Sequence, residues 1–164
     1  MKFDDAIVTA LGSNLAGGRA SSVAVLEAAV ARFEAIGLKI LSLSSFWRSA
    51  SWPDPTQPDY INAVALVETS LGPEAALAAL HHLEAEFGRQ RGEANAPRVL
   101  DLDLIAYGRT VSDMPALPHP RAADRLFVMG PLAEIAPGWR HPVLGETASV
   151  LAERARVGAD ATPL

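Results

Sequence analysis

Two aspartates stand two residues apart in the segment PRVLDLDL at positions 97 to 104. In an extended chain alternate side chains point to opposite faces, so Asp101 and Asp103 share one face and the three leucines share the other. Carboxylates at this spacing suit Mg²⁺, which takes one or two of them and completes its shell with water and phosphate oxygens. Two such ions side by side could stabilise both the attacking and the leaving oxygen of a displacement at phosphorus. The alternative is a half-exposed strand whose acids meet only water.

Arginines gather near these acids. Only two of the 14 basic residues are lysines. The stretch from position 89 to position 125, which contains the acids, includes Arg89, Arg91, Arg98, Arg121 and Arg125. A planar guanidinium suits bidentate contacts with phosphate, although a bias toward arginine can also be compositional. Cations for a polyphosphate next to carboxylates for its metal predict a metal–polyphosphate site.

The segment YINAVALVET at positions 60 to 69 offers a second kind of site. Tyr60 and Asn62 share a face of this predicted strand, which places an aromatic ring beside an amide that both donates and accepts. Such a pair suits a flat heterocycle with mixed polar edges. Alternatively, Tyr60 is an edge residue and Asn62 belongs to a turn. Phe127 could be a second aromatic plate, or a core residue of LFVMGPL.

Glu84 and His119 are further candidates. Glu84 could bond a nucleotide sugar or base, or it could be a surface acid of a helix. His119 has no partner histidine at zinc-site spacing, so a phosphate contact suits it better than a metal. The sequence contains neither a GxxxxGK[ST] phosphate loop nor a GxSxG nucleophile motif.

The elements that must hold these residues follow from hydrophobic periodicity and turn signals. The spacing predicts, in order, a strand at 5–11, a helix at 23–33, strands at 38–47 and 60–69, a helix at 73–87 and a strand at 98–107. This order is the split βαβ of a ferredoxin-like α+β fold, with an antiparallel sheet, helices on one face and the acids on the outward face. Short helices are expected within 122–136 and 146–156. The loops 49–59 and 88–97 are expected to act as lids.

Length, composition and charge limit the class of protein to which the chain can belong. With 164 residues and 49% hydrophobic content, we expect a single domain over 1–164. The net charge of −5 argues against a nucleic-acid binder. The sequence has no cysteine, and its start fits neither a signal peptide nor a membrane span. We therefore expect a soluble, cytoplasmic protein, without a membrane partner, that acts as a monomer.

Six motifs in order resemble one enzyme family. They are GSNL at 12–15, SSFWRS at 44–49, QPDYINA at 57–63, the RxR of Arg89 and Arg91, PRVLDLDL at 97–104 and PHPRAADRLFVMGPLAEIAP at 118–137. Together they resemble the 6-hydroxymethyl-7,8-dihydropterin pyrophosphokinases of folate biosynthesis, from about residue 6 to residue 150. The resemblance implies transfer of the β,γ-diphosphate of ATP, as co-substrate, to the hydroxymethyl oxygen of the reduced pterin, with two Mg²⁺ ions bound and AMP released.

By position, the resemblance also implies roles for particular residues. Asp101 and Asp103 match the metal ligands and, with Arg89 and Arg98, make up the catalytic set. The positions matching the pterin pocket are Gly12, Ser49, Ala50, Trp52, Tyr60, Asn62 and Phe127. The positions matching ATP contacts are Glu84, Arg89, Arg91, Arg98, His119 and Arg125.

The chain departs from the family pattern in several places. Ala50 and Ser51 stand where the family often has a proline pair, which predicts a less rigid loop. The loop 88–97 is one residue shorter than usual, with Asn95 where a tryptophan is common. Pro120 follows His119 where an aromatic residue is common, and Arg121 has no assigned partner.

Two rival functions remain open: a kinase that moves only the γ-phosphate, and a non-catalytic ferredoxin-like module, for instance one that binds RNA. The RNA-binding module would need exposed aromatic residues on the sheet and a basic field, and the central acids argue against it. The reaction product separates the three functions.

Overall fold

The computed structural model describes residues 3–51, 53–88 and 97–164. Over these residues the chain forms a six-stranded antiparallel sheet in the order β5-β1-β4-β3-β8, with β2 also paired to β4. The strands of this sheet are β1 (Ile7–Ser13), β2 (Lys39–Leu43), β3 (Trp47–Ser49), β4 (Tyr60–Glu68), β5 (Asp101–Tyr107) and β8 (Thr162–Pro163). A separate hairpin joins β6 (Ser112–Asp113) to β7 (Ala116–Leu117).

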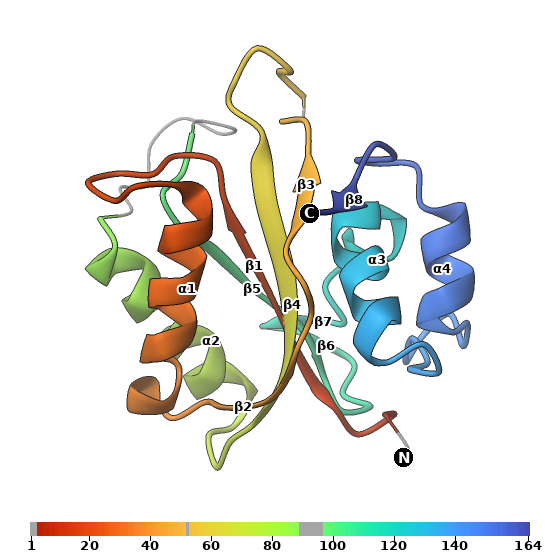
Figure 1. Ribbon diagram of the computed structural model, residues 1–164. Coiled ribbons are helices and arrows are strands. Elements are labelled where there is room, and N and C mark those ends of the chain that lie inside the picture. Colours follow the sequence, from red (N-terminus) through yellow and green to blue (C-terminus); the bar gives the residue numbers. More distant parts are fainter. Residues whose placement is uncertain (1–2, 52, 89–96) are drawn as a thin grey trace.

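The helices separate onto the two faces of the sheet (Figure 1). They are α1 (Ser22–Arg32), α2 (Pro73–Glu86), α3 (Leu126–Ile135) and α4 (Ala148–Arg154), with 3-10 turns η1 (Glu34–Ile36) and η2 (Ala122–Asp124). Ser21 caps α1, because its side chain accepts the Ala24 N–H, and Pro73 begins α2, where its missing N–H costs no helical hydrogen bond. The predicted ferredoxin-like order is confirmed: β1, α1, the successive strands β2 and β3, β4, α2 and β5 follow one another along the chain.

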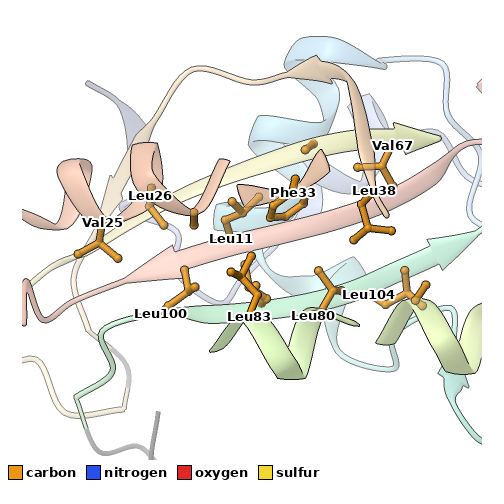
Figure 2. Packing of buried hydrophobic residues seen from close by; sticks show 14 of the residues in the cluster. Leu11, Val25, Leu26, Phe33, Leu38, Val67, Leu80, Leu83, Leu100 and Leu104 are labelled. Carbon is orange, nitrogen blue, oxygen red and sulfur yellow. The ribbon is translucent and has the colours of Figure 1, made fainter. Parts of the chain in front are cut away.

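The leucine face of β5 packs against α2, in a core that residues of α1 complete, as predicted. Leu100, Leu102 and Leu104 join one buried cluster with residues of both helices. Figure 2 shows Leu80 and Leu83 of α2 along the same row as Leu100 and Leu104, with Leu26 of α1 in the same cluster. Because this cluster holds β5 from one side, the side chains of Asp101 and Asp103 must point to the other side of the sheet.

The sequence predicted that the opposite face of the sheet, which carries the acids, points outward. The structure confirms this for only part of that face. The register of β5 against β1 shifts between Val8 and Thr9, and Ile105 and Ala106 both join a second buried cluster. The α3 and α4 helices and the buried Trp139 complete this cluster. The C-terminal elements therefore cover part of the acidic face and leave the part around the two aspartates open.

The prediction of one strand at 38–47 is wrong, because the chain forms two strands there, β2 and β3, with a break between Leu43 and Trp47. At the break, the Ser44 hydroxyl accepts the Val64 N–H at 2.9 Å. Next to it, the Ser45 N–H donates to the Glu134 carboxylate of α3 at 2.6 Å. Together with the backbone bond from the Ser44 N–H to Val64 at 2.9 Å, these side-chain hydrogen bonds connect the break to β4 and to α3.

In the described parts of the chain, no helix combines the length and the apolar composition that a bilayer crossing requires.

His141 should make the protein less stable in acid. Its Nδ1 accepts the N–H groups of Val143 at 3.2 Å and Leu144 at 3.0 Å, and burial, reinforced by Arg109, lowers its pKa. Below a pH of about 6.5, the histidine of the unfolded chain binds a proton that the folded chain does not, so the free energy of unfolding falls as the pH drops. For one proton the slope is at most about 1.4 kcal/mol per pH unit.

Denaturation curves between pH 7 and pH 5 check this prediction. His141→Asn keeps an acceptor but cannot titrate, so its stability should depend less on pH than that of the wild type. Equal slopes for the wild type and His141→Asn would contradict the prediction.

Candidate active site

A pocket of about 590 Å³ opens over the uncovered part of the sheet. Its floor comes from the ends of β1, β4 and β5, and its walls come from the residues after β3 and from residues 119–128. Of the residues selected from the sequence, the pocket brings together Gly12, Ser49, Ala50, Tyr60, Asn62, Arg98, Asp101, Asp103, His119, Arg125 and Phe127. These residues come from segments far apart in the chain.

Asp101 and Asp103 both line the pocket, as the alternation of β5 predicted. In the register of the sheet, Gly12 pairs with Asp101 and Ala10 pairs with Asp103 on the neighbouring β1. The small residues on β1 place no large side chain next to either carboxylate from that strand, and both acids line the pocket.

The donor set fits a hydrated magnesium ion. Within the described ranges, no group of three or more His, Cys, Asp or Glu residues gathers to form a closed metal cage. Two carboxylates on one face of a strand, open to a pocket, match the way Mg²⁺ keeps several waters and takes phosphate oxygens as further ligands.

Two arginines surround these acids with positive charge. The Arg98 Nη1 donates to the Asp101 carboxylate at 3.1 Å. Arg125 is half-buried at the pocket, with its guanidinium carbon 5.6 Å from the centroid of the Phe127 ring. Burial lowers the pKa of Arg125 and the negative charge of Asp103 opposes that shift, so the side chain remains a cation.

His119 is held as a neutral hydrogen-bond donor. Its backbone N–H donates to Ile105 at 2.8 Å, and its Nδ1 accepts the N–H of Arg121 at 3.2 Å. Burial, followed by the charges of Arg125 and Arg121, lowers the pKa of the imidazole. Because Nδ1 accepts, the ring proton resides on Nε2, which can donate to an anionic ligand.

The side of the pocket near β4 is flat and polar. The Asn62 amide nitrogen donates to the Ser49 hydroxyl at 3.1 Å, and this bond orients the buried amide. Gly12 faces both members of the predicted pair, because a β-carbon there would lie 3.2 Å from Asn62 Oδ1 and 3.5 Å from Tyr60 Cδ1. A larger residue at position 12 would therefore fill the space between the backbone of β1 and these two side chains.

Within the described residues, one selected residue, Glu84, does not line the pocket. Trp52, Arg89 and Arg91 lie outside the described residues, as does Asn95. Glu84 is 1% exposed, and its carboxylate accepts the Leu102 N–H at 2.7 Å. The surface alternative for Glu84 is therefore wrong, and its contact with a nucleotide stays a prediction.

Sequence reasoning gave no role to several residues that the pocket contains. His81, Gln57 and Arg121 line it. Asn14 lies at its edge, 2% exposed, where its Oδ1 accepts the Arg98 N–H at 2.8 Å and its Nδ2 donates to the Ser51 hydroxyl at 3.1 Å. The sequence held one signal for Asn14, an amide directly after a buried strand, in GSN. A buried amide without a hydrogen-bond partner costs free energy, so partners could be expected there.

Comparisons with known proteins agree on one family. Residues 8–137 match the family described as 7,8-dihydro-6-hydroxymethylpterin-pyrophosphokinase. The chain is 42% identical over 132 residues to the 2-amino-4-hydroxy-6-hydroxymethyldihydropteridine pyrophosphokinase of Synechocystis sp., covering 79% of this chain and 67% of the relative. The protein of the same name from Pseudomonas aeruginosa is 38% identical over 139 residues, covering 83% of each chain.

A solved structure shows the same fold at low sequence identity. The wild-type Plasmodium falciparum HPPK-DHPS with STZ-DHP superposes with a TM-score of 0.70 at 13% identity, over 90% of this chain. This chain spans only 42% of that longer protein. With the fold, the family match and the curated relatives in agreement, the chain belongs to the 7,8-dihydro-6-hydroxymethylpterin-pyrophosphokinase family.

Proposed function

We propose that this pyrophosphokinase transfers the β,γ-diphosphate of ATP to the hydroxymethyl group of 6-hydroxymethyl-7,8-dihydropterin and releases AMP, as a step of folate biosynthesis. The observation that carries the proposal is the composition of one pocket. Asp101 and Asp103 line it together with Arg98, Arg125 and other polar residues, and the Tyr60–Asn62 pair lines it too. A polyphosphate and a flat heterocycle can therefore bind next to each other.

In this proposal, the protein acts by positioning and by stabilising charge. Asp101 and Asp103 would hold two Mg²⁺ ions, which would neutralise and align the triphosphate. Tyr60 and Asn62 hold the pterin so that its hydroxymethyl oxygen lies in line with the β-phosphorus. The new bond joins that oxygen to the β-phosphorus as the bond to the α-phosphate oxygen breaks.

The cationic side chains serve the phosphates. Arg98 and Arg125 stabilise the negative charge that shifts toward the departing AMP, and Nε2 of His119 donates to a phosphate oxygen. We assign the same task to Arg89 and Arg91, and a nucleotide contact to Glu84, on the resemblance alone. We further propose that the enzyme works as a cytoplasmic monomer. The lack of cysteines suits a reducing compartment, and residues of one chain line the pocket.

Product analysis tests the function directly. The protein is incubated with MgATP and the reduced pterin, and the nucleotide products are separated. AMP formed in equal amount to the pterin diphosphate is the expected result. ADP would identify a γ-phosphate kinase, and unchanged ATP with bound pterin would identify a binding module.

Tyr60→Ala should weaken pterin binding far more than ATP binding. Removing the ring takes away one face of the flat site, and stacking on an aromatic residue contributes on the order of 1 kcal/mol beyond the area it buries. We expect the KM for the pterin to rise about tenfold or more, because burial of the ring area is lost as well. Steady-state kinetics with each substrate varied in turn measures both constants, and an unchanged pterin KM would place the pterin elsewhere.

A further inference from the structure

The segment after α4 returns to the candidate active site, although it lies beyond residues 8–137 that match the family. The N–H of Leu126 donates to Val157 at 2.9 Å, and β8 pairs with β3. Further along, the N–H of Leu164 donates to Phe46 at 2.9 Å. The segment is therefore fastened at both ends, once beside α3 and once beside β3.

Between these two attachments, Asp160 contacts the wall of the pocket. Its Oδ2 accepts the backbone N–H of Ala50 at 2.8 Å. Ala50 lines the pocket directly after Ser49, whose hydroxyl orients the Asn62 amide. The hydrogen bond therefore holds the chain at the point where it leaves β3 and turns into the loop that follows.

The same segment supports a second wall. Gly158 has a φ of +66°, and a β-carbon on it would lie 2.5 Å from Cδ1 of the Phe127 ring. Only glycine combines this backbone conformation with so close an approach. The backbone at Gly158 thus lies directly against Phe127, which also lines the pocket.

These contacts compensate for a departure in the sequence. Ala50 and Ser51 stand where the family often has prolines, which predicted a loose loop. Both residues are nevertheless held by side-chain hydrogen bonds, Ala50 by Asp160 and Ser51 by Asn14 and the carbonyl of Pro58. Hydrogen bonds here do what a fixed proline φ would otherwise do.

We propose that residues 157–160 are a positioning element of the pterin pocket, in which Asp160 holds Ala50 and Gly158 seats Phe127. Neither residue need touch the substrate. The inference rests on the proposed function, since it names the pterin as the ligand of these walls. It predicts that damage to the segment raises the KM for the pterin and leaves the KM for ATP as it was.

Two aspartate variants of the full chain test the first contact. Asp160→Ala removes the acceptor and should raise the pterin KM about three- to tenfold, the effect of losing one charge-assisted hydrogen bond at an exposed site. Asp160→Asn keeps an acceptor and should restore most of the affinity. The exposed Asp113 of β6 is the control, and Asp113→Ala should keep wild-type constants.

A matched pair of glycines tests the second contact. Gly158→Ala should raise the pterin KM more than tenfold, because the new methyl group must push the Phe127 ring out of place. Gly145 has a similar φ of +74° with no atom within 4 Å of the β-carbon position. Gly145→Ala therefore suffers the same backbone strain without the contact, and it should keep the wild-type KM.

The outcomes separate the two hypotheses. If wild-type protein makes AMP from MgATP and the pterin while Asp160→Ala and Gly158→Ala keep the wild-type pterin KM, the positioning role is overturned and the function stands. If a variant lowers only the melting temperature, or raises both KM values equally, the segment is merely structural. If the wild type makes no AMP, the proposed function itself fails.

Discussion

Asp101→Asn and Asp103→Asn are each expected to lower kcat by about a thousandfold or more while the protein stays folded. Asparagine has nearly the same shape as aspartate but carries no charge, so each variant loses a metal ligand of the kind Mg²⁺ requires. Losing charge stabilisation at the transferred phosphoryl groups typically costs several kcal/mol of barrier, and each 1.4 kcal/mol is tenfold in rate. AMP formation under saturating substrates measures the loss.

The fold should tolerate both changes. The Asp101 side chain is 27% exposed at the pocket, and the core on the other face of β5 consists of leucines. A melting temperature within a few degrees of the wild type would confirm this. Asp113→Asn, an exposed acid on the neighbouring hairpin, is the control and should keep full activity. Normal turnover in either site variant would remove the metal assignment.

Local periodicity explains why this part of the site was predictable. Successive side chains of a strand point to opposite faces. Because the leucines of β5 face the helix-covered core, the acids between them must face the other way. The same rule placed Tyr60 and Asn62 together on β4. Where a pattern of two or four residues determines the direction of a side chain, the sequence alone was sufficient.

Contacts across long stretches of chain were beyond that reasoning. The hydrogen bond from Ala50 to Asp160 joins residues 110 positions apart, and neither residue type indicates the other. The register shift between Val8 and Thr9 lets Ala106 join Ile105 on the acidic side of the sheet, where both pack in the cluster that includes residues of α3. No periodicity in the sequence marks it, so the half-covered face of the sheet could not be foreseen.

The burial of two polar side chains could not be predicted from the sequence, for one physical reason. Glu84 lies on α2, where an acid usually meets water, yet it is buried and bonded to the backbone of β5. Asn14 follows a strand, where a turn is the common reading, yet it connects Arg98 to Ser51. Each is tolerated inside because its partners compensate the loss of water, and those partners are supplied by tertiary structure.

Arg125→Ala should lower kcat/KM by about a hundredfold to a thousandfold, the size expected when a preorganised charge is removed from a phosphoryl-transfer site. Arg125 is half-buried in the pocket near both acids, where a cation interacts more strongly than at an exposed position. Arg125→Lys should recover little, because an ammonium group can neither bind two phosphate oxygens in a plane nor stack on Phe127 as the guanidinium does.

The lysine variant separates charge from geometry, which alanine alone cannot do. If net positive charge were sufficient, Arg125→Lys would approach wild-type activity, and the planar, stacked guanidinium would have no special role. The matched control is Arg154 of α4, whose side chain is 61% exposed and paired with Glu146 away from the pocket. Arg154→Ala changes the net charge by the same amount. If that variant also lost much of its kcat/KM, the effect of Arg125→Ala would come from the overall electrostatic field of the protein and not from the site. Because the distant arginine is solvated and screened, its loss should leave kcat/KM within about twofold of the wild type.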